Sequence, residues 1–204
     1  MSETKRHAAM RAPRRAFQTG ATLLEFALVF GLFLTLVFGI IEIARIMYIY
    51  NTLQEVTRRA AAAAATSDFS NAATTNAIRQ NAIFRTSPGE LVLASPVSDQ
   101  HVRIDYLALT RQPNGTTTMV EIAPSSLPSC PGKNRQICMG DPNASNCIRF
   151  VRVRVCNPAN TDQCDRVDYS SFTQLVNLPV KLPTAPTIVP AESLGFTPGM
   201  GPCS

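Results

Sequence analysis

A long apolar segment near the N-terminus limits what this chain can fold into more than any other feature. Residues 20–41 read GATLLEFALVFGLFLTLVFGII, and Glu25 is the only charged residue among them. The hydrocarbon core of a bilayer is about 30 Å thick and requires roughly 20 apolar residues in a helix. The residues before this segment are basic, with Lys5, Arg6, Arg11, Arg14 and Arg15. The sequence therefore predicts a single-pass anchor whose N-terminal flank stays in the cytoplasm.

Glu25 is an unusual residue for a simple anchor. A carboxylate within a membrane-spanning helix costs about 2.5–3.5 kcal/mol on insertion scales and suggests a function. One interpretation is that Glu25 lies near the headgroups and reaches water. The other is that the chain is cut between Gly20 and Ala21, which leaves a new ammonium on Ala21, one helical turn from Glu25. The amine of a neighbouring copy would then neutralise Glu25 in a lipid-surrounded assembly.

The residues around this bond resemble a known motif. Gly20 ends a basic leader, and Glu25 with Phe26 follows in GATLLEFAL, as in the cleavage motif of type IV prepilins. The stretch of about residues 15–66 resembles the TadE-like pseudopilins, minor pilins of tight-adherence pilus systems. The other matching elements are FGIIE at 38–42, Arg45, Tyr48, Tyr50 and the alanine tract after Arg58 and Arg59.

This resemblance implies a function without catalysis. The chain would be a minor pilin or pseudopilin that initiates or assembles a tight-adherence pilus, and a prepilin peptidase would cut it after Gly20. Glu25 and Phe26 would then act in assembly, with the inner membrane, other pilins and the assembly machinery as partners. The C-terminal part would lie in the periplasm. The alternative is a signal-anchored binding or adhesion protein that is never cut at Gly20 and never joins a pilus.

The helix is expected to continue beyond the membrane. No proline occurs between Pro13 and Pro88, so a helix over residues 21–66 is predicted, about 70 Å long at 1.5 Å per residue. Past the apolar segment a stripe recurs at helical spacing, formed by Ile46, Ile49, Leu53, Val56 and Ala60. Glu42 and Arg45 are interpreted as an exposed helical pair worth tenths of a kcal/mol, and Tyr48 and Tyr50 as an interfacial aromatic belt.

Residues 67–204 predict a second unit with a different pattern. Ser67 and Asp68 are expected to break the first helix and cap a weaker helix over 71–85. Alternation at period two then predicts strands at 91–94, 101–109, 116–122 and 148–156, the middle two joined by a turn at 113–115. Residues 124–146 are expected to be a loop, and 186–189 an edge strand or extended cover. The predicted fold is α+β, with a leader over 1–20, a helix over 21–66 and an extracytoplasmic domain over 67–204.

Cysteine usage and charge limit the remaining functions. The six cysteines all follow residue 129 and predict disulfides of unspecified pairing: Cys130, Cys138, Cys147, Cys156, Cys164 and Cys203. No CxxC motif is present, so metal binding is not expected. The leader accounts for +4 of the net charge of +5, which argues against nucleic-acid binding by the remainder. No GxSxG, HExxH or P-loop pattern occurs, so neither catalysis nor a cofactor is predicted.

Overall fold

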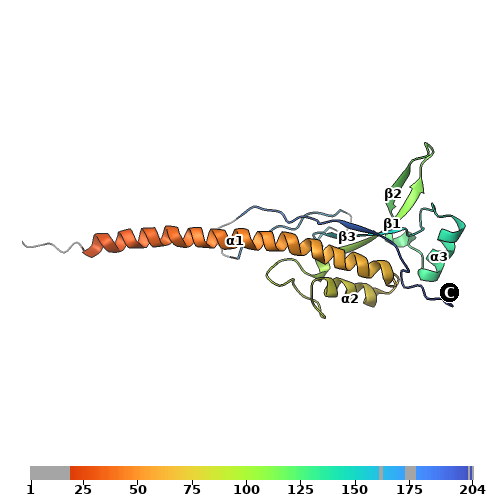
Figure 1. Cartoon of the computed structure of the whole chain (residues 1–204), viewed down its shortest axis with the longest axis horizontal. Helices are drawn as coiled ribbons and strands as arrows, with labels where there is room; N and C mark the ends of the chain where they lie inside the picture. Colours follow the sequence, from red (N-terminus) through yellow and green to blue (C-terminus); the bar gives the residue numbers. More distant parts are fainter. Residues whose placement is uncertain (1–18, 161–162, 173–177, 202, 204) are drawn as a thin grey trace, which may run out of the picture.

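One long helix sets the shape of the molecule. The structure is a computed structural model that describes residues 19–160, 163–172, 178–201 and 203. Helix α1 (Thr19–Thr66) is 48 residues long, and its N-terminal half extends away from the rest of the chain while its C-terminal half lies along it (Figure 1). The expected helix over 21–66 is therefore confirmed. Of the predicted leader, residues 1–18 lie outside the described part of the chain.

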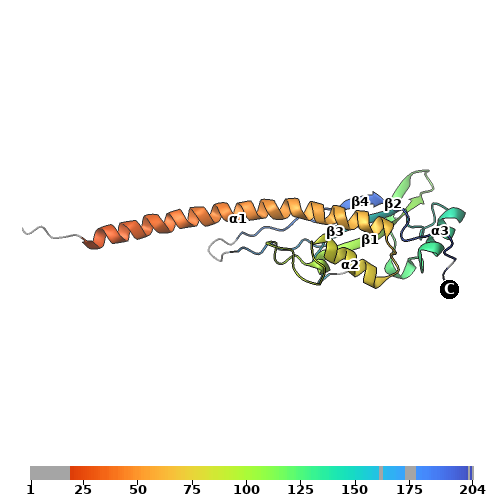
Figure 2. The same ribbon diagram turned by 60° about the horizontal axis from the view of Figure 1, so that its bottom comes forward.

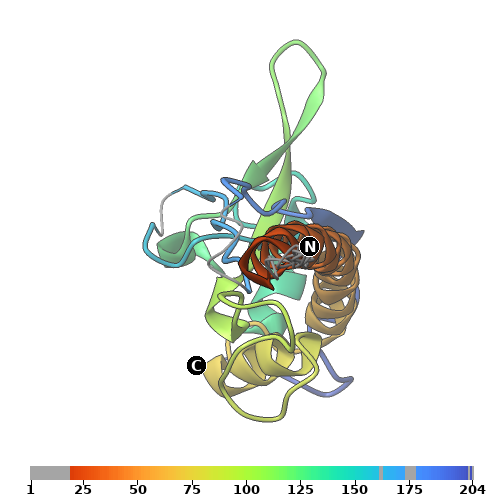
Figure 3. The ribbon, with the colours of Figure 1, turned by 90° about the vertical axis from the view of Figure 1, so that its left-hand side faces the viewer.

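A four-stranded antiparallel sheet packs against the C-terminal half of α1. The strands are β1 (Val102–Arg111), β2 (Thr117–Glu121), β3 (Phe150–Val155) and β4 (Thr187–Pro190), in the order β2-β1-β3-β4. Gly115, with φ of +82°, lies in the turn between β1 and β2, where a left-handed backbone favours glycine. Seen along α1, this hairpin projects away from the body of the molecule (Figure 3). The hairpin, the strand over 148–156 and the edge strand over 186–189 are confirmed, with shorter bounds.

The core forms where the apolar stripe of α1 meets the sheet. Ile49, Leu53 and Val56 are completely buried, as the helical spacing predicts. From the sheet, alternate residues of β3 point into the same core, and Val151 and Val153 are also completely buried. Because the opposite residues of β3 face away, one face of the sheet packs on α1 and the other carries charged side chains. Figure 2 shows α1 running alongside the strands.

The segment between α1 and the sheet differs from its prediction in two places. Helix α2 (Ala72–Ala82) is capped by Asn71, whose side chain accepts the amides of Ala73 and Thr74, and not by Ser67 or Asp68. The strand expected over 91–94 is wrong, because these residues form turns whose hydrogen bonds close locally, for example from the Ala94 amide to the Leu91 carbonyl at 3.1 Å. The short 3-10 helices are η1 (Asp99–His101) and η2 (Pro124–Ser126).

The region expected to be a loop contains a helix. Helix α3 (Pro131–Gly140) begins with a proline, which is favoured in the first helical turn. Disulfides hold this distal end, pairing Cys138 with Cys147 and Cys130 with Cys203. The third pair is Cys156 with Cys164, which follows β3. All six cysteines are thus paired, and the last disulfide-bonded residue, Cys203, ties the C-terminal tail to α3.

Candidate assembly site along helix α1

The residues predicted for processing lie in the first turn of α1. Gly20 and Ala21 are exposed, and a Cβ added at Gly20 would meet no atom within 4 Å. The fold of this chain therefore leaves room for a side chain at position 20. Any requirement for glycine there must come from a partner that approaches the bond closely.

Glu25 and Phe26 follow on the same exposed segment. Phe26 is 69% exposed, and its ring stacks on Phe30 with centroids 5.7 Å apart. Glu25 is exposed as well and lies one helical turn from Ala21. The structure thus places these residues together on the part of α1 that extends beyond the sheet (Figure 1).

The surface around Glu25 is continuously apolar. In the described part of the chain, α1 is the one helix long and apolar enough to cross a membrane, and only 6% of its most apolar window is buried. A core helix of a soluble protein buries such residues, because leaving them in water is unfavourable. The helix could therefore anchor the chain in a membrane.

Glu42 and Arg45 lie directly after this apolar segment, and the expectation that they form an exposed ion pair is wrong. Glu42 is only 1% exposed, and its carboxylate accepts hydrogen bonds from the hydroxyl of Tyr169 and from the amide of Phe172, the latter at 2.7 Å. The Arg45 guanidinium lies 3.9 Å from the same carboxylate. Glu42 is buried, and Arg45 is largely covered, because the segment after β3 packs against this part of α1. The local sequence of α1 gives no sign of this distant segment.

Arg45 extends the same network to a second loop. Its guanidinium donates to the carbonyl oxygens of Leu93, at 2.8 Å, and of Ser170, at 2.7 Å. The cation also lies 5.2 Å from the centre of the Tyr169 ring. One arginine therefore joins α1, the turn before β1 and the segment after β3. We call Glu42, Arg45 and Tyr169 the collar network.

The environment of Tyr169 matches its role as a donor. Burial raises the pKa of this phenol above its ordinary value, and the hydrogen bond to Glu42 raises that pKa further. Tyr169 therefore keeps its proton and can donate a hydrogen bond to the Glu42 carboxylate.

Tyr48 and Tyr50 were expected to form an aromatic belt at the membrane interface. The hydroxyl of Tyr50 donates to the Lys181 carbonyl at 3.1 Å, and the hydroxyl of Tyr48 lies 3.5 Å from the Val92 carbonyl. Both hydroxyls thus contact the globular part.

A second polar cluster occupies the sheet face opposite α1. Asp105 accepts hydrogen bonds from three guanidinium groups, those of Arg103, Arg152 and Arg154. Burial by itself would raise the pKa of Asp105, but the hydrogen bonds from Arg103 and Arg154 and their charges outweigh it and hold this pKa below its ordinary value. The alternation of β3 explains the two arginines, as expected, and their charges are balanced by Asp105 and Glu121.

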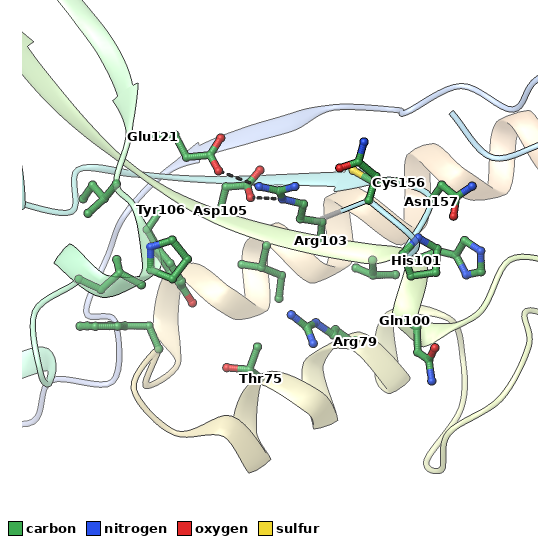
Figure 4. A pocket seen from close by; sticks show the side chains of 18 residues that line it. Thr75, Arg79, Gln100, His101, Arg103, Asp105, Tyr106, Glu121, Cys156 and Asn157 are labelled. Carbon is green, nitrogen blue, oxygen red and sulfur yellow. Dashed lines mark hydrogen bonds and ion pairs between the residues drawn. The ribbon is translucent and has the colours of Figure 1, made fainter. Parts of the chain in front are cut away.

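A cleft of about 470 Å³ lies between this cluster and α2. Figure 4 shows Arg103 and Asp105 on one side of β1, and Thr75 and Arg79 reaching from α2 on the other. Strand β2 pairs with β1 only from Leu107 to Arg111, so the cleft borders the part of β1 that β2 does not cover. His101 lines the cleft. Its Nδ1 accepts a hydrogen bond from the Ser98 amide at 3.0 Å, so the lone pair that a general base would need is already in use.

Metal ligands are not gathered in this cleft. Across the described ranges, no group of three or more His, Cys, Asp or Glu side chains is arranged to hold a metal ion. The sequence resemblance includes Glu42 and Arg45 but gives no sign of their contacts in the collar network, since Tyr169 and Phe172 carry no local signal. The position of Glu42, a charge directly after an apolar run, was a further available signal.

Comparison with known proteins points to the same segment of α1. The family model described as TadE-like protein matches residues 20–62. Searches of the curated proteins and of the solved structures gave no significant match. The matched residues include Gly20, Glu25, Glu42 and Arg45, together with most of the buried stripe. Over these residues, which form the exposed apolar part of α1 and the start of the core, the chain is similar to the TadE-like family.

Proposed function

We propose that this chain is a minor pilin or pseudopilin that initiates or assembles a tight-adherence pilus, and that a prepilin peptidase matures it by cutting after Gly20. The observation that carries the proposal is the match of residues 20–62 to the TadE-like family on a helix whose N-terminal half is exposed and apolar. The TadE-like family is structural rather than enzymatic. The chain would therefore be the substrate of a protease and a component of an assembly.

Localisation follows from the same features. The basic flank stays in the cytoplasm, α1 crosses the inner membrane once, and the sheet lies in the periplasm. Three disulfides support this orientation, because they form and persist in oxidising compartments such as the periplasm. After cleavage, the ammonium of Ala21 in one copy would neutralise Glu25 in a neighbour. Phe26 would pack beside this pair within the apolar contact.

The experiment that tests the proposal is the N-terminal sequence and intact mass of the protein from cells with and without the peptidase. The expected product starts at Ala21 only when the peptidase is present. Gly20→Leu should block cleavage, because a bulky side chain crowds the bond. Gly31→Leu is the matched control, since both glycines lie on exposed helix with no atom within 4 Å of an added Cβ. A chain that starts near Met1 in both strains would instead support a signal-anchored surface protein.

A further inference from the structure

Three large apolar side chains are exposed on two loops beside α1. Val92 and Leu93 are 58% and 66% exposed in the turn before β1, and Phe172 is 73% exposed in the segment after β3. Leu93 has φ of +59°, which is uncommon for a residue with a branched side chain. Exposed apolar side chains on one level of a molecule indicate a surface that contacts something other than water.

The collar network holds both loops at the same level of α1. The Glu42 carboxylate accepts the amide of Phe172 at 2.7 Å, and Arg45 donates to the carbonyl of Leu93 at 2.8 Å. Both contacts are made by backbone groups of the loops, so the side chains of Leu93 and Phe172 are left to project outward. Figures 1 and 2 show that the globular part ends at about this level and that α1 continues alone.

This level coincides with the end of the apolar segment. A helix that enters the hydrocarbon at Ala21 has crossed about 30 Å by Ile41, at 1.5 Å per residue. Glu42 and Arg45 then lie at the membrane surface, and the two loops lie beside them. Ile41 and Ile43, on α1 itself, are also about half exposed, at 48% and 57%. Exposed apolar side chains are therefore present on α1 and on both loops at this level.

We infer that Val92, Leu93 and Phe172 dock the globular part onto the bilayer that α1 crosses, by inserting into the boundary between headgroups and acyl chains. The inference rests on the membrane anchor of the proposed function and adds a second contact with lipid. Burial of Glu42 fits this position, because its carboxylate is covered by Tyr169 and Arg45 and does not meet the acyl chains. Two lipid contacts around the helix would restrict how the globular part tilts on its anchor.

Tryptophan fluorescence tests the inference directly, because the chain contains no tryptophan. Full-length variants Leu93→Trp and Phe172→Trp are placed in nanodiscs at one copy per disc, with lipids brominated along their acyl chains as quenchers. Phe33→Trp, on the exposed apolar helix, is the control for insertion. Met119→Trp is the control for water exposure, since Met119 is 52% exposed on β2, far from the anchor.

The expected result is a blue-shifted emission for Leu93→Trp and Phe172→Trp that bromines near the headgroups quench at least twofold, with no quenching for Met119→Trp. The inference would be overturned if Leu93→Trp and Phe172→Trp showed the same emission wavelength and the same lack of quenching as Met119→Trp. A blue shift without bromine quenching would also overturn it, because the side chains would then be covered by protein. If Phe33→Trp itself is not quenched, the anchor has not inserted, and the proposed membrane function fails together with the docking.

Discussion

Tyr169 and Glu42 are 127 residues apart in sequence, and the Tyr169 hydroxyl donates a hydrogen bond to the buried Glu42 carboxylate. This contact joins the end of the apolar segment to the chain that follows β3. Arg45, one helical turn further on, donates to the Ser170 carbonyl in the same segment and to the Leu93 carbonyl in the turn before β1. The anchor and the globular part are therefore connected by side-chain contacts as well as by the continuous helix.

Loss of the collar network should destabilise the globular part. Tyr169→Phe leaves the buried carboxylate of Glu42 without one donor, so the free energy of unfolding should fall by about 1–3 kcal/mol. The double variant Glu42→Gln, Tyr169→Phe should lose less than the sum of the single variants, because the two side chains share one interaction. Urea unfolding in detergent micelles measures both effects.

Glu55→Gln provides the control for this prediction. Glu55 belongs to the same helix but keeps 44% of its side chain exposed, and within the described residues its ion pairs are with Arg58 and Arg59 at the surface. Its replacement should change the free energy of unfolding by less than about 1 kcal/mol. Strictly additive losses in the double variant would show that Glu42 and Tyr169 are not coupled.

Glu25 should be required for assembly and not for insertion. In Glu25→Ala the helix becomes more apolar, so it should still insert, and Gly20 is unchanged, so cleavage should continue. Without the carboxylate, the ammonium of Ala21 in a neighbouring copy has no partner in lipid, and piliation should be lost. Counting surface pili, with mature protein measured in the same cells, checks this. Normal piliation by Glu25→Ala would contradict the assigned role, and Glu55→Ala should assemble normally.

The pH dependence of folding should report on His101. Burial lowers the pKa of His101 below its ordinary value, while Glu90 and Asp99 oppose the shift. The folded state therefore prefers the neutral ring, as the hydrogen bond from the Ser98 amide to Nδ1 requires. Between the folded pKa and the ordinary value of 6.5, the unfolded chain binds more protons. The stabilisation is present above pH 6.5 and is lost as the pH falls through the folded pKa.

His101→Gln should remove this dependence. In a chain cut after Gly20, His101 is the only histidine, because His7 belongs to the leader. The measurement is the free energy of unfolding between about pH 5 and pH 7.5, where histidine titrates and most carboxylates do not. A slope that is unchanged in His101→Gln would assign the effect to other groups.

The disulfides should contribute unequally to stability. Cys130 and Cys203 close a loop with a sequence separation of 73, whereas Cys138 and Cys147 are separated by 9. In the chain-entropy model the longer loop constrains the unfolded state more, by about 2 kcal/mol. Replacing Cys130 and Cys203 by alanine should therefore lower the melting temperature more than replacing Cys138 and Cys147. Equal losses would show that local strain or contacts outweigh loop entropy.

Local patterns predicted most of the secondary structure. The apolar segment and the stripe from Ile49 to Ala60 indicate one continuous helix, because a helix forms from contacts three and four residues apart. Alternation in β3 identified its buried face for a similar reason. The turn over 91–94 was missed because its four apolar residues resemble a short strand, although only Leu91 and Ala94 are buried and Val92 and Leu93 are exposed. Helix α3 was missed because proline, disulfides and Asn134 stabilise it, and these leave no apolar periodicity.

By itself, the sequence determined that this chain has an apolar segment long enough to span a membrane, a candidate cleavage bond after Gly20, and a helix that continues into an α+β part. These properties depend on residues close together in the chain, whose hydropathy and spacing can be read directly. Only the tertiary structure decided the cysteine pairing and the environment of Glu42. Two of the disulfides close short loops, but six cysteines allow many pairings and the spacing alone does not choose among them. The pairing of Cys130 with Cys203 and the contact of Glu42 with Tyr169 join segments 73 and 127 residues apart, and no local preference states which distant backbone will cover a charge. For this reason Glu42 reads as an exposed ion pair in sequence and is a buried contact in the fold.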